Sequence, residues 1–144
     1  MVILFLLFVN GFFVAAEFSL VKVRKTRLEQ LCNEGNSLAK KALKLVTNVN
    51  KMLAAAQMGV TIASIALGWV AEATIVQLIQ PVINIFITSH NAVVSHTVAI
   101  PLAFIIVTYF HVLLGEQLPK CLSLKHPETF ALWIATPMDM FITI

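Results

Sequence analysis

A carboxylate within an apolar stretch is the side chain of this protein best placed to do chemistry. Glu116 follows Gly115 and precedes Pro119 by three residues, at the end of the most hydrophobic part of the chain. Because proline has no N–H to donate to the carbonyl four residues back, a helix here would leave the Gly115 C=O without its usual partner. That oxygen and the Glu116 carboxylate are two hard oxygen ligands at membrane depth. The segment therefore predicts a cation site.

A salt bridge is the other interpretation of Glu116, because Lys120 lies four residues further on, on the same face of a helix. The glycine before Glu116 and the proline after it favour the ligand interpretation. The sequence shows no nucleophile–base pair and no cluster of metal-ligating side chains. It therefore does not predict an enzyme.

Other polar residues interrupt the apolar stretches. Gln57 and Thr61 are four residues apart and share a helical face, with Ser64 near it. They offer uncharged oxygens either to a cation or to a neighbouring helix. Glu17 and Asn10 are candidates for an ion path. The alternative for Glu17 is snorkelling to the inner interface, and for Asn10 a hydrogen bond to another helix.

The elements that must position these residues are membrane helices. The chain is 59% hydrophobic and 12% charged, with a mean hydropathy of +0.90, whereas soluble domains average about 25% charged residues. Three stretches are long enough to cross the roughly 30 Å of hydrocarbon: residues 1–21, 52–79 and 92–114. A short helix at 127–144 would be re-entrant, interfacial or an incomplete span. We predict an all-α membrane protein with three transmembrane helices and a cytoplasmic belt of amphipathic juxtamembrane helices.

The basic residues set the expected topology. Eight of the ten Lys and Arg residues lie between the first and second stretches, two follow the third, and residues 80–91 have none. By the positive-inside rule, the loop 22–51 and the C-terminal side are cytoplasmic and the N-terminus is outside. We expect a multi-pass protein of the cell (plasma or inner) membrane, with reduced thiols at Cys32 and Cys121. No motif or aromatic pattern supports nucleic-acid binding.

Residues 24–47 read as amphipathic helices, because apolar residues recur there at three- and four-residue steps among basic ones. The segment 34–37 is expected to break the pattern, and Asn36 or Ser37 can cap the second half. The basic face suits an anionic inner leaflet of the bilayer. The segment is interpreted as a helical collar lying on the membrane.

Small residues recur along the second stretch. Ala55, Gly59 and Ala63 form a stripe that allows close packing against another span of the chain or a second subunit. A continuous helix of this length is about 43 Å long, which exceeds the bilayer core. The helix is therefore expected to tilt, protrude or break, and Gly68 is the candidate breaking point.

Taken in order, four segments resemble the DUF21 transmembrane domain of the CorC and cyclin M (CNNM) family, often called hemolysin-like proteins. The segments are 10–17, 27–31, 57–64 and 115–120. The resemblance implies a homodimer with three spans per chain, a short helical hairpin and a cytoplasmic helical belt. It implies export of Mg²⁺, coupled to Na⁺, with no organic cofactor in this domain. Full-length members continue into paired CBS domains and a C-terminal domain, which we expect to be absent from this chain.

The family's cation is held by serines of the first helix, an asparagine of the second, and the Gly-Glu of the third. Gly115 and Glu116 match this pattern, but Val14 and Ala16 stand where serines are common, and Gln57 stands in place of the asparagine. The resemblance implies Gly115 and Glu116 as the core of the cation site. Gln57 and Thr61 are expected to add further oxygens, and Pro119, Lys120 and Gly59 are expected to have structural roles. Two alternatives stay open: a non-transporting membrane anchor or regulatory module, and export of another cation such as a polyamine.

Overall fold

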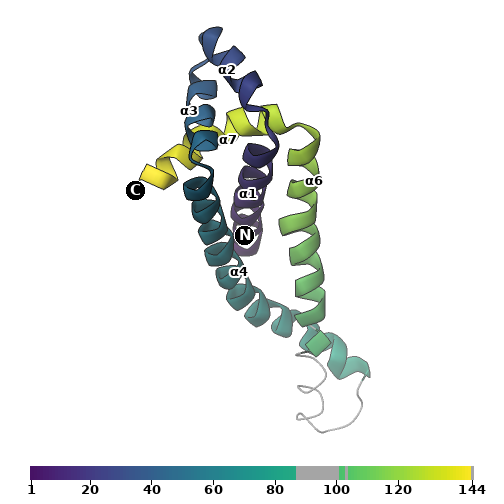
Figure 1. Ribbon diagram of the computed structural model, residues 1–144. Helices are drawn as coiled ribbons and strands as arrows, with labels where there is room; N and C mark the ends of the chain where they lie inside the picture. Colours follow the sequence, from purple (N-terminus) through teal and green to yellow (C-terminus); the bar gives the residue numbers. More distant parts are fainter. Residues whose placement is uncertain (87–100, 103, 144) are drawn as a thin grey trace.

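The computed structural model describes residues 1–86, 101, 102 and 104–143, and every element in this part of the chain is a helix (Figure 1). The all-α class predicted from the sequence is confirmed. The elements are α1 (Val2–Lys22), α2 (Lys25–Asn33), α3 (Ser37–Thr47), α4 (Val49–Phe86), the π-helix η1 (His111–Gln117), α6 (Leu118–Lys125) and α7 (Pro127–Thr143).

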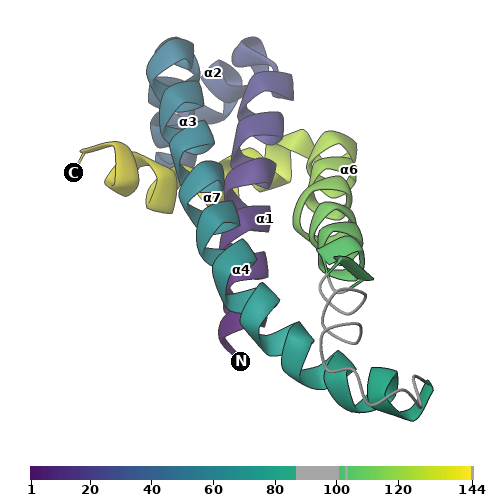
Figure 2. The ribbon, with the colours of Figure 1, turned by 90° about the horizontal axis from the view of Figure 1, so that it is seen from below.

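Two helices of the described chain are long and apolar enough to cross a membrane: Val2–Lys22 and Val49–Val70. Of the three alternatives for the long helix, a break at Gly68 does not occur, because α4 continues through this residue and through Pro81 (Figures 1 and 2). One glycine in a helix interior costs only about 1 kcal/mol relative to alanine, which the adjoining turns offset. Residues 92–100 and 103 of the remaining predicted span, 92–114, lie outside the described residues.

The helix that carries Glu116 does not end at Leu114. Residues 104–110 are helical and lead directly into η1, where the N–H of Leu118 donates to the carbonyl of Leu113, five residues back. Pro119 follows near the start of α6, where it donates no backbone hydrogen bond to the preceding turn. A continuous rod therefore runs to Lys125 beside α1 (Figure 1).

The predicted break between the amphipathic helices is confirmed. Gly35 has a φ of +89°, a conformation that favours glycine, and Asn36 caps α3 by accepting from the N–H groups of Leu38 and Ala39 at 2.9 and 3.2 Å.

The apolar face of α3 does not lie free on the membrane surface, as the collar interpretation required. Its buried residues pack against α7, which lies across the end of α1 (Figures 1 and 2). Lys44 Nζ lies 2.8 Å from Asp139 Oδ1, and Arg27 Nε lies 3.3 Å from Glu128 Oε2, so basic residues of the belt tie it to α7. The buried residues of the two helices are Ala39, Ala42 and Leu45 of α3 and Ala131, Ile134, Ala135 and Met138 of α7.

The small-residue stripe of α4 packs within the chain. A Cβ added at Gly59 would lie 2.5 Å from the ring of Phe13 in α1. The Phe13 ring also lies against Phe141 of α7, with centroids 5.0 Å apart. Gly59 therefore gives no support to a subunit interface, because the ring of Phe13 already fills the space that its missing side chain leaves.

Candidate cation site

Asn10 is the centre of a polar network in the middle of α1. Its side chain is completely buried, at 0% exposure. Its Nδ2 donates to the carbonyl oxygen of Gly115 at 3.1 Å and lies 3.3 Å from Nε2 of His111, both in η1. Its Oδ1 accepts from the hydroxyl of Ser64 in α4 at 3.2 Å. One amide thus joins three helices, and we call these four residues the Asn10 network.

The partners of Asn10 fix which way its amide points. The Gly115 carbonyl can only accept, so the atom facing it must be the amide nitrogen. The second amide hydrogen then faces Nε2 of His111, which must accept and therefore carries no proton there. In this arrangement both hydrogens of Asn10 and its oxygen are satisfied, as a buried polar group requires.

Two glycines lie where α1 meets the rod and allow a close approach. A Cβ at Gly115 would lie 2.9 Å from His111 Cδ2 and 3.0 Å from Asn10 Nδ2. A Cβ at Gly11 would lie 3.3 Å from Cγ of Pro119. The missing side chains let the Gly115 carbonyl approach α1 closely enough to meet Asn10. The turn at η1 is π-helical. Such turns are rare in proteins overall, and those that occur are often found at functional sites.

The Gly115 carbonyl is paired, although Pro119 cannot serve it. The sequence predicted a freed oxygen at this position, and the structure gives that oxygen the Asn10 amide as its partner. The predicted alternative for Asn10, a hydrogen bond to a neighbouring helix, is confirmed. A carbonyl oxygen has two lone pairs, so it is able to accept from a second partner besides Asn10.

Glu116 is half-buried, and the structure records no ion pair for it among the described residues. The Lys120 ammonium, its expected alternative partner, lies over the Phe18 ring instead, 4.5 Å from the centroid. Glu17 is also half-buried and likewise takes part in neither of the two recorded salt bridges.

The structure does not bring Gln57 and Thr61 to Gly115. Both are exposed, and the Thr61 hydroxyl donates to the backbone carbonyl of Gln57 at 2.8 Å. Ser64, one helical turn further, reaches the network in their place. His111 was missed by the sequence reasoning, although it precedes Gly115 by four residues and so lies on the same helical side. No group of three or more His, Cys, Asp or Glu suited to a metal occurs within the described ranges.

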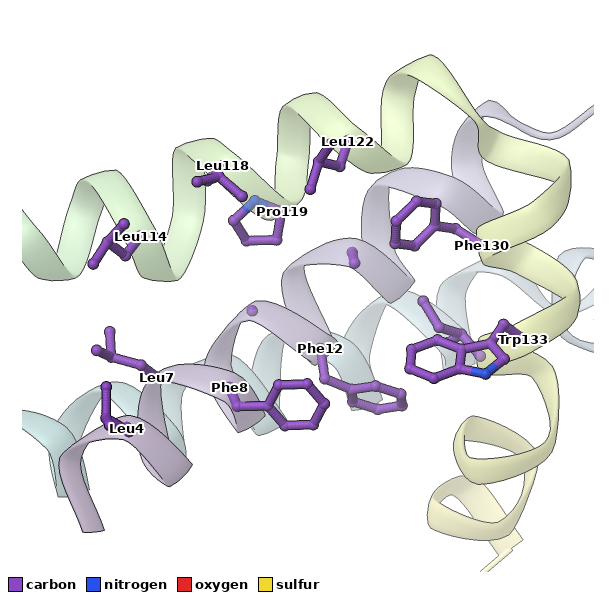
Figure 3. Close-up of a pocket in the computed structure, with 13 residues that line it drawn as sticks. Leu4, Leu7, Phe8, Phe12, Leu114, Leu118, Pro119, Leu122, Phe130 and Trp133 are labelled. Carbon is purple, nitrogen blue, oxygen red and sulfur yellow. The ribbon is translucent and has the colours of Figure 1, made fainter. Parts of the chain in front are cut away.

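An apolar groove of about 330 Å³ lies beside the network, between α1, the η1–α6 rod and α7 (Figure 3). Among its lining side chains the indole N–H of Trp133 is the one polar group. Such a lining cannot replace the water around an ion, so the groove is not suited to conduct one. The residues labelled along it are Leu4, Leu7, Phe8 and Phe12 of α1, Leu114, Leu118, Pro119 and Leu122 of the rod, and Phe130 and Trp133 of α7.

Comparison with known proteins decides the family. The family model described as the cyclin M transmembrane N-terminal domain matches residues 1–144. The chain belongs to the cyclin M transmembrane-domain family. The resemblance of the four sequence segments is thereby confirmed across the whole length.

Curated relatives support the same assignment. The UPF0053 protein YugS of Bacillus subtilis is 39% identical over 136 residues, covering 94% of this chain and 31% of the relative. The UPF0053 protein YrkA of the same organism is 37% identical over 139 residues, which cover 96% of this chain and 32% of the relative. The polyamine export protein of Haemophilus influenzae is 29% identical over 126 residues, covering 87% and 28%. The chain thus spans about a third of the length of these relatives.

Proposed function

We propose that this domain is a membrane cation-transport module whose site is built on Gly115 and Glu116, and that Mg²⁺, coupled to Na⁺, is the exported ion. One observation carries the proposal: a buried polar network converges on the Gly115 carbonyl inside apolar helices, and the residue that follows Gly115 is the half-buried Glu116. Buried polar and ionisable groups at membrane depth are costly and mark ion pathways.

The chemistry of the site follows from its two ligands. Glu116 supplies negative charge and Gly115 a carbonyl dipole. Mg²⁺ gives up water reluctantly and is usually held by one or two carboxylates with several waters retained. Gln57 and Thr61 are exposed on α4, so they contribute through such waters or from a second subunit. We accordingly propose a homodimer with three spans per chain, an outside N-terminus and a cytoplasmic belt beside the anionic leaflet.

Export of a polyamine is the second candidate, favoured by the similarity to the polyamine export protein of Haemophilus influenzae. Val14 and Ala16 stand where family members carry serines, and both are buried in helix packing, at 5% and 0% exposure. Neither offers an oxygen to a metal ion. A long cation would rely on carboxylates instead, and Glu116 and Glu17 are the half-buried ones available. A non-transporting anchor is the third reading of the missing serines.

Flux measurements separate these functions. The protein is reconstituted in liposomes, and the fluxes of Mg²⁺, Na⁺ and spermidine are followed for wild type and Glu116→Gln. The substitution keeps the shape and removes the charge, so it should abolish transport while the protein still inserts. Glu34→Gln, at an exposed carboxylate after α2, is the matched control and should transport normally. Full transport by Glu116→Gln would remove the carboxylate from the mechanism and favour the anchor.

A further inference from the structure

Two hydrogen-bond acceptors face one point in the Asn10 network. The carbonyl oxygen of Gly115 lies 3.1 Å and Nε2 of His111 lies 3.3 Å from the same atom, Nδ2 of Asn10. The amide hydrogens now fill the space between these acceptors. An oxygen in place of Nδ2 would create three acceptors around one point, an arrangement that is repulsive unless a cation lies among them.

We infer that Asn10 is the positioning residue of the cation site and works in two orientations. In the described orientation its amide hydrogens hold Gly115 and His111 together without a cation. After a half-turn of the amide, Oδ1 joins the Gly115 carbonyl and His111 Nε2 as a cation-binding triad. The inference rests on the proposed function, in which Glu116, the residue after Gly115, is the source of the charge that three neutral ligands lack.

The surroundings of Asn10 permit the turn. The terminal torsion of an asparagine is broad and roughly two-fold, and its two ends have nearly the same shape, so packing around the buried amide is preserved. The remaining partner is the Ser64 hydroxyl, which donates to Oδ1 now and can accept from Nδ2 afterwards. A carbonyl or an ammonium in the place of Ser64 would allow one orientation only.

The ligand class follows from the donor set. Two oxygens and an imidazole nitrogen, all neutral, suit a cation that takes three acceptors at one point: a small divalent metal ion or a primary ammonium group. Imidazole favours borderline metals such as Mn²⁺ over Mg²⁺. An ammonium has three hydrogens to give to three acceptors. Parallel titrations with Mg²⁺, Mn²⁺ and spermidine distinguish these sources.

Substitutions at Asn10 separate positioning from mere packing. Asn10→Asp presents only acceptors and needs no turn, whereas Asn10→Leu keeps similar bulk and removes both polar atoms. Binding is measured by calorimetry and by the shift in thermal unfolding, in detergent at pH 8. Asn10→Asp should bind the preferred cation about tenfold more tightly than wild type, because the fraction in the binding orientation is no longer limiting. Asn10→Leu should bind it at least about tenfold more weakly.

The control is Asn48→Asp, which adds the same charge at an exposed asparagine outside the network and should bind like wild type. If Asn10→Asp unfolds without a cation, recovery of its thermal transition on adding Mg²⁺ or Mn²⁺ supports the inference, and no recovery overturns it. Equal weakening in Asn10→Asp and Asn10→Leu would show a packing role and also overturn it. Transport retained by Glu116→Gln would contradict the proposed function but not this inference. The cation affinities of wild type, Asn10→Asp and Asn10→Leu are compared by binding measurements that do not depend on flux.

Discussion

Gly59→Ala should destabilise the helix pair α1–α4 by a measurable amount, although alanine is the better helix former. The added Cβ would lie 2.5 to 2.6 Å from three atoms of the Phe13 ring. That ring is itself confined by Phe141 at 5.0 Å and by Phe12 at 5.3 Å between centroids. The ring cannot swing away freely, so the helices must move apart.

Gly68 provides a matched reference for the magnitude. It lies in the same helix, and a Cβ there meets nothing within 4 Å. Both substitutions gain the same helix propensity, about 1 kcal/mol. The difference between the two variants therefore isolates the clash, which for an overpacked core is about 1–3 kcal/mol. Gly68→Ala should be neutral or stabilising, and the free energy of unfolding of Gly59→Ala should be lower than that of Gly68→Ala by about 1–3 kcal/mol.

The assay is reversible unfolding in mixed micelles, followed by far-UV circular dichroism, for both variants and for the double mutant Phe13→Leu with Gly59→Ala. The smaller side chain removes the ring that the Cβ meets, so the double mutant should recover much of the loss attributed to Gly59→Ala. Equal stabilities of Gly59→Ala and Gly68→Ala would refute the reasoning. A loss seen only as dissociation of a dimer would place the stripe at a subunit interface instead.

Two further predictions concern the rod and the topology. Pro119→Ala supplies an N–H that competes with Asn10 for the Gly115 carbonyl. The cation affinity, measured by calorimetry, should therefore fall, but less than in Glu116→Gln. An unchanged affinity would mean that the missing N–H of Pro119 is irrelevant to the site. With Cys32 and Cys121 replaced by serine, a cysteine at Ser89 should react with an impermeant thiol reagent added outside intact cells, and one at Ser37 should not, since the loop 22–51 is expected to be cytoplasmic. The opposite labelling pattern would invert the topology.

Local signals in the sequence were enough for much of the architecture. The break at 34–37 depends on Gly35 and Asn36, whose backbone and capping preferences act within a few residues, and the structure has it there. The apolar stretches likewise gave α1 and the beginning of α4 to within a few residues. The apolar face of α3 was misread for a physical reason. The same periodicity serves a helix on a bilayer and a helix on protein, and only α7, about ninety residues away, decides between them.

The site was predicted in part, and its missing half depends on long-range geometry. The segment 115–119 identified a carbonyl that Pro119 cannot serve, which follows from covalent structure alone. The partner of that carbonyl is Asn10, 105 residues away. No local pattern relates these positions, and the two glycines that let the helices approach look like ordinary small residues in the sequence.

The π-helix explains why facing residues could not be assigned by counting. Helical faces are read at 3.6 residues per turn, about 100° per residue. At η1 the N–H of Leu118 reaches five residues back instead of four, which adds one residue to the turn. Residues after the turn are therefore displaced by about 100° from the face that an uninterrupted α-helix would give them. The network at Asn10 lies within this turn, holding the Gly115 carbonyl and the His111 ring on the same side. The Asn10 bonds hold the Gly115 carbonyl within this turn, so any loss of them that lets η1 relax to an α-helix should turn the residues that follow it, from Leu118 onward, about the helix axis.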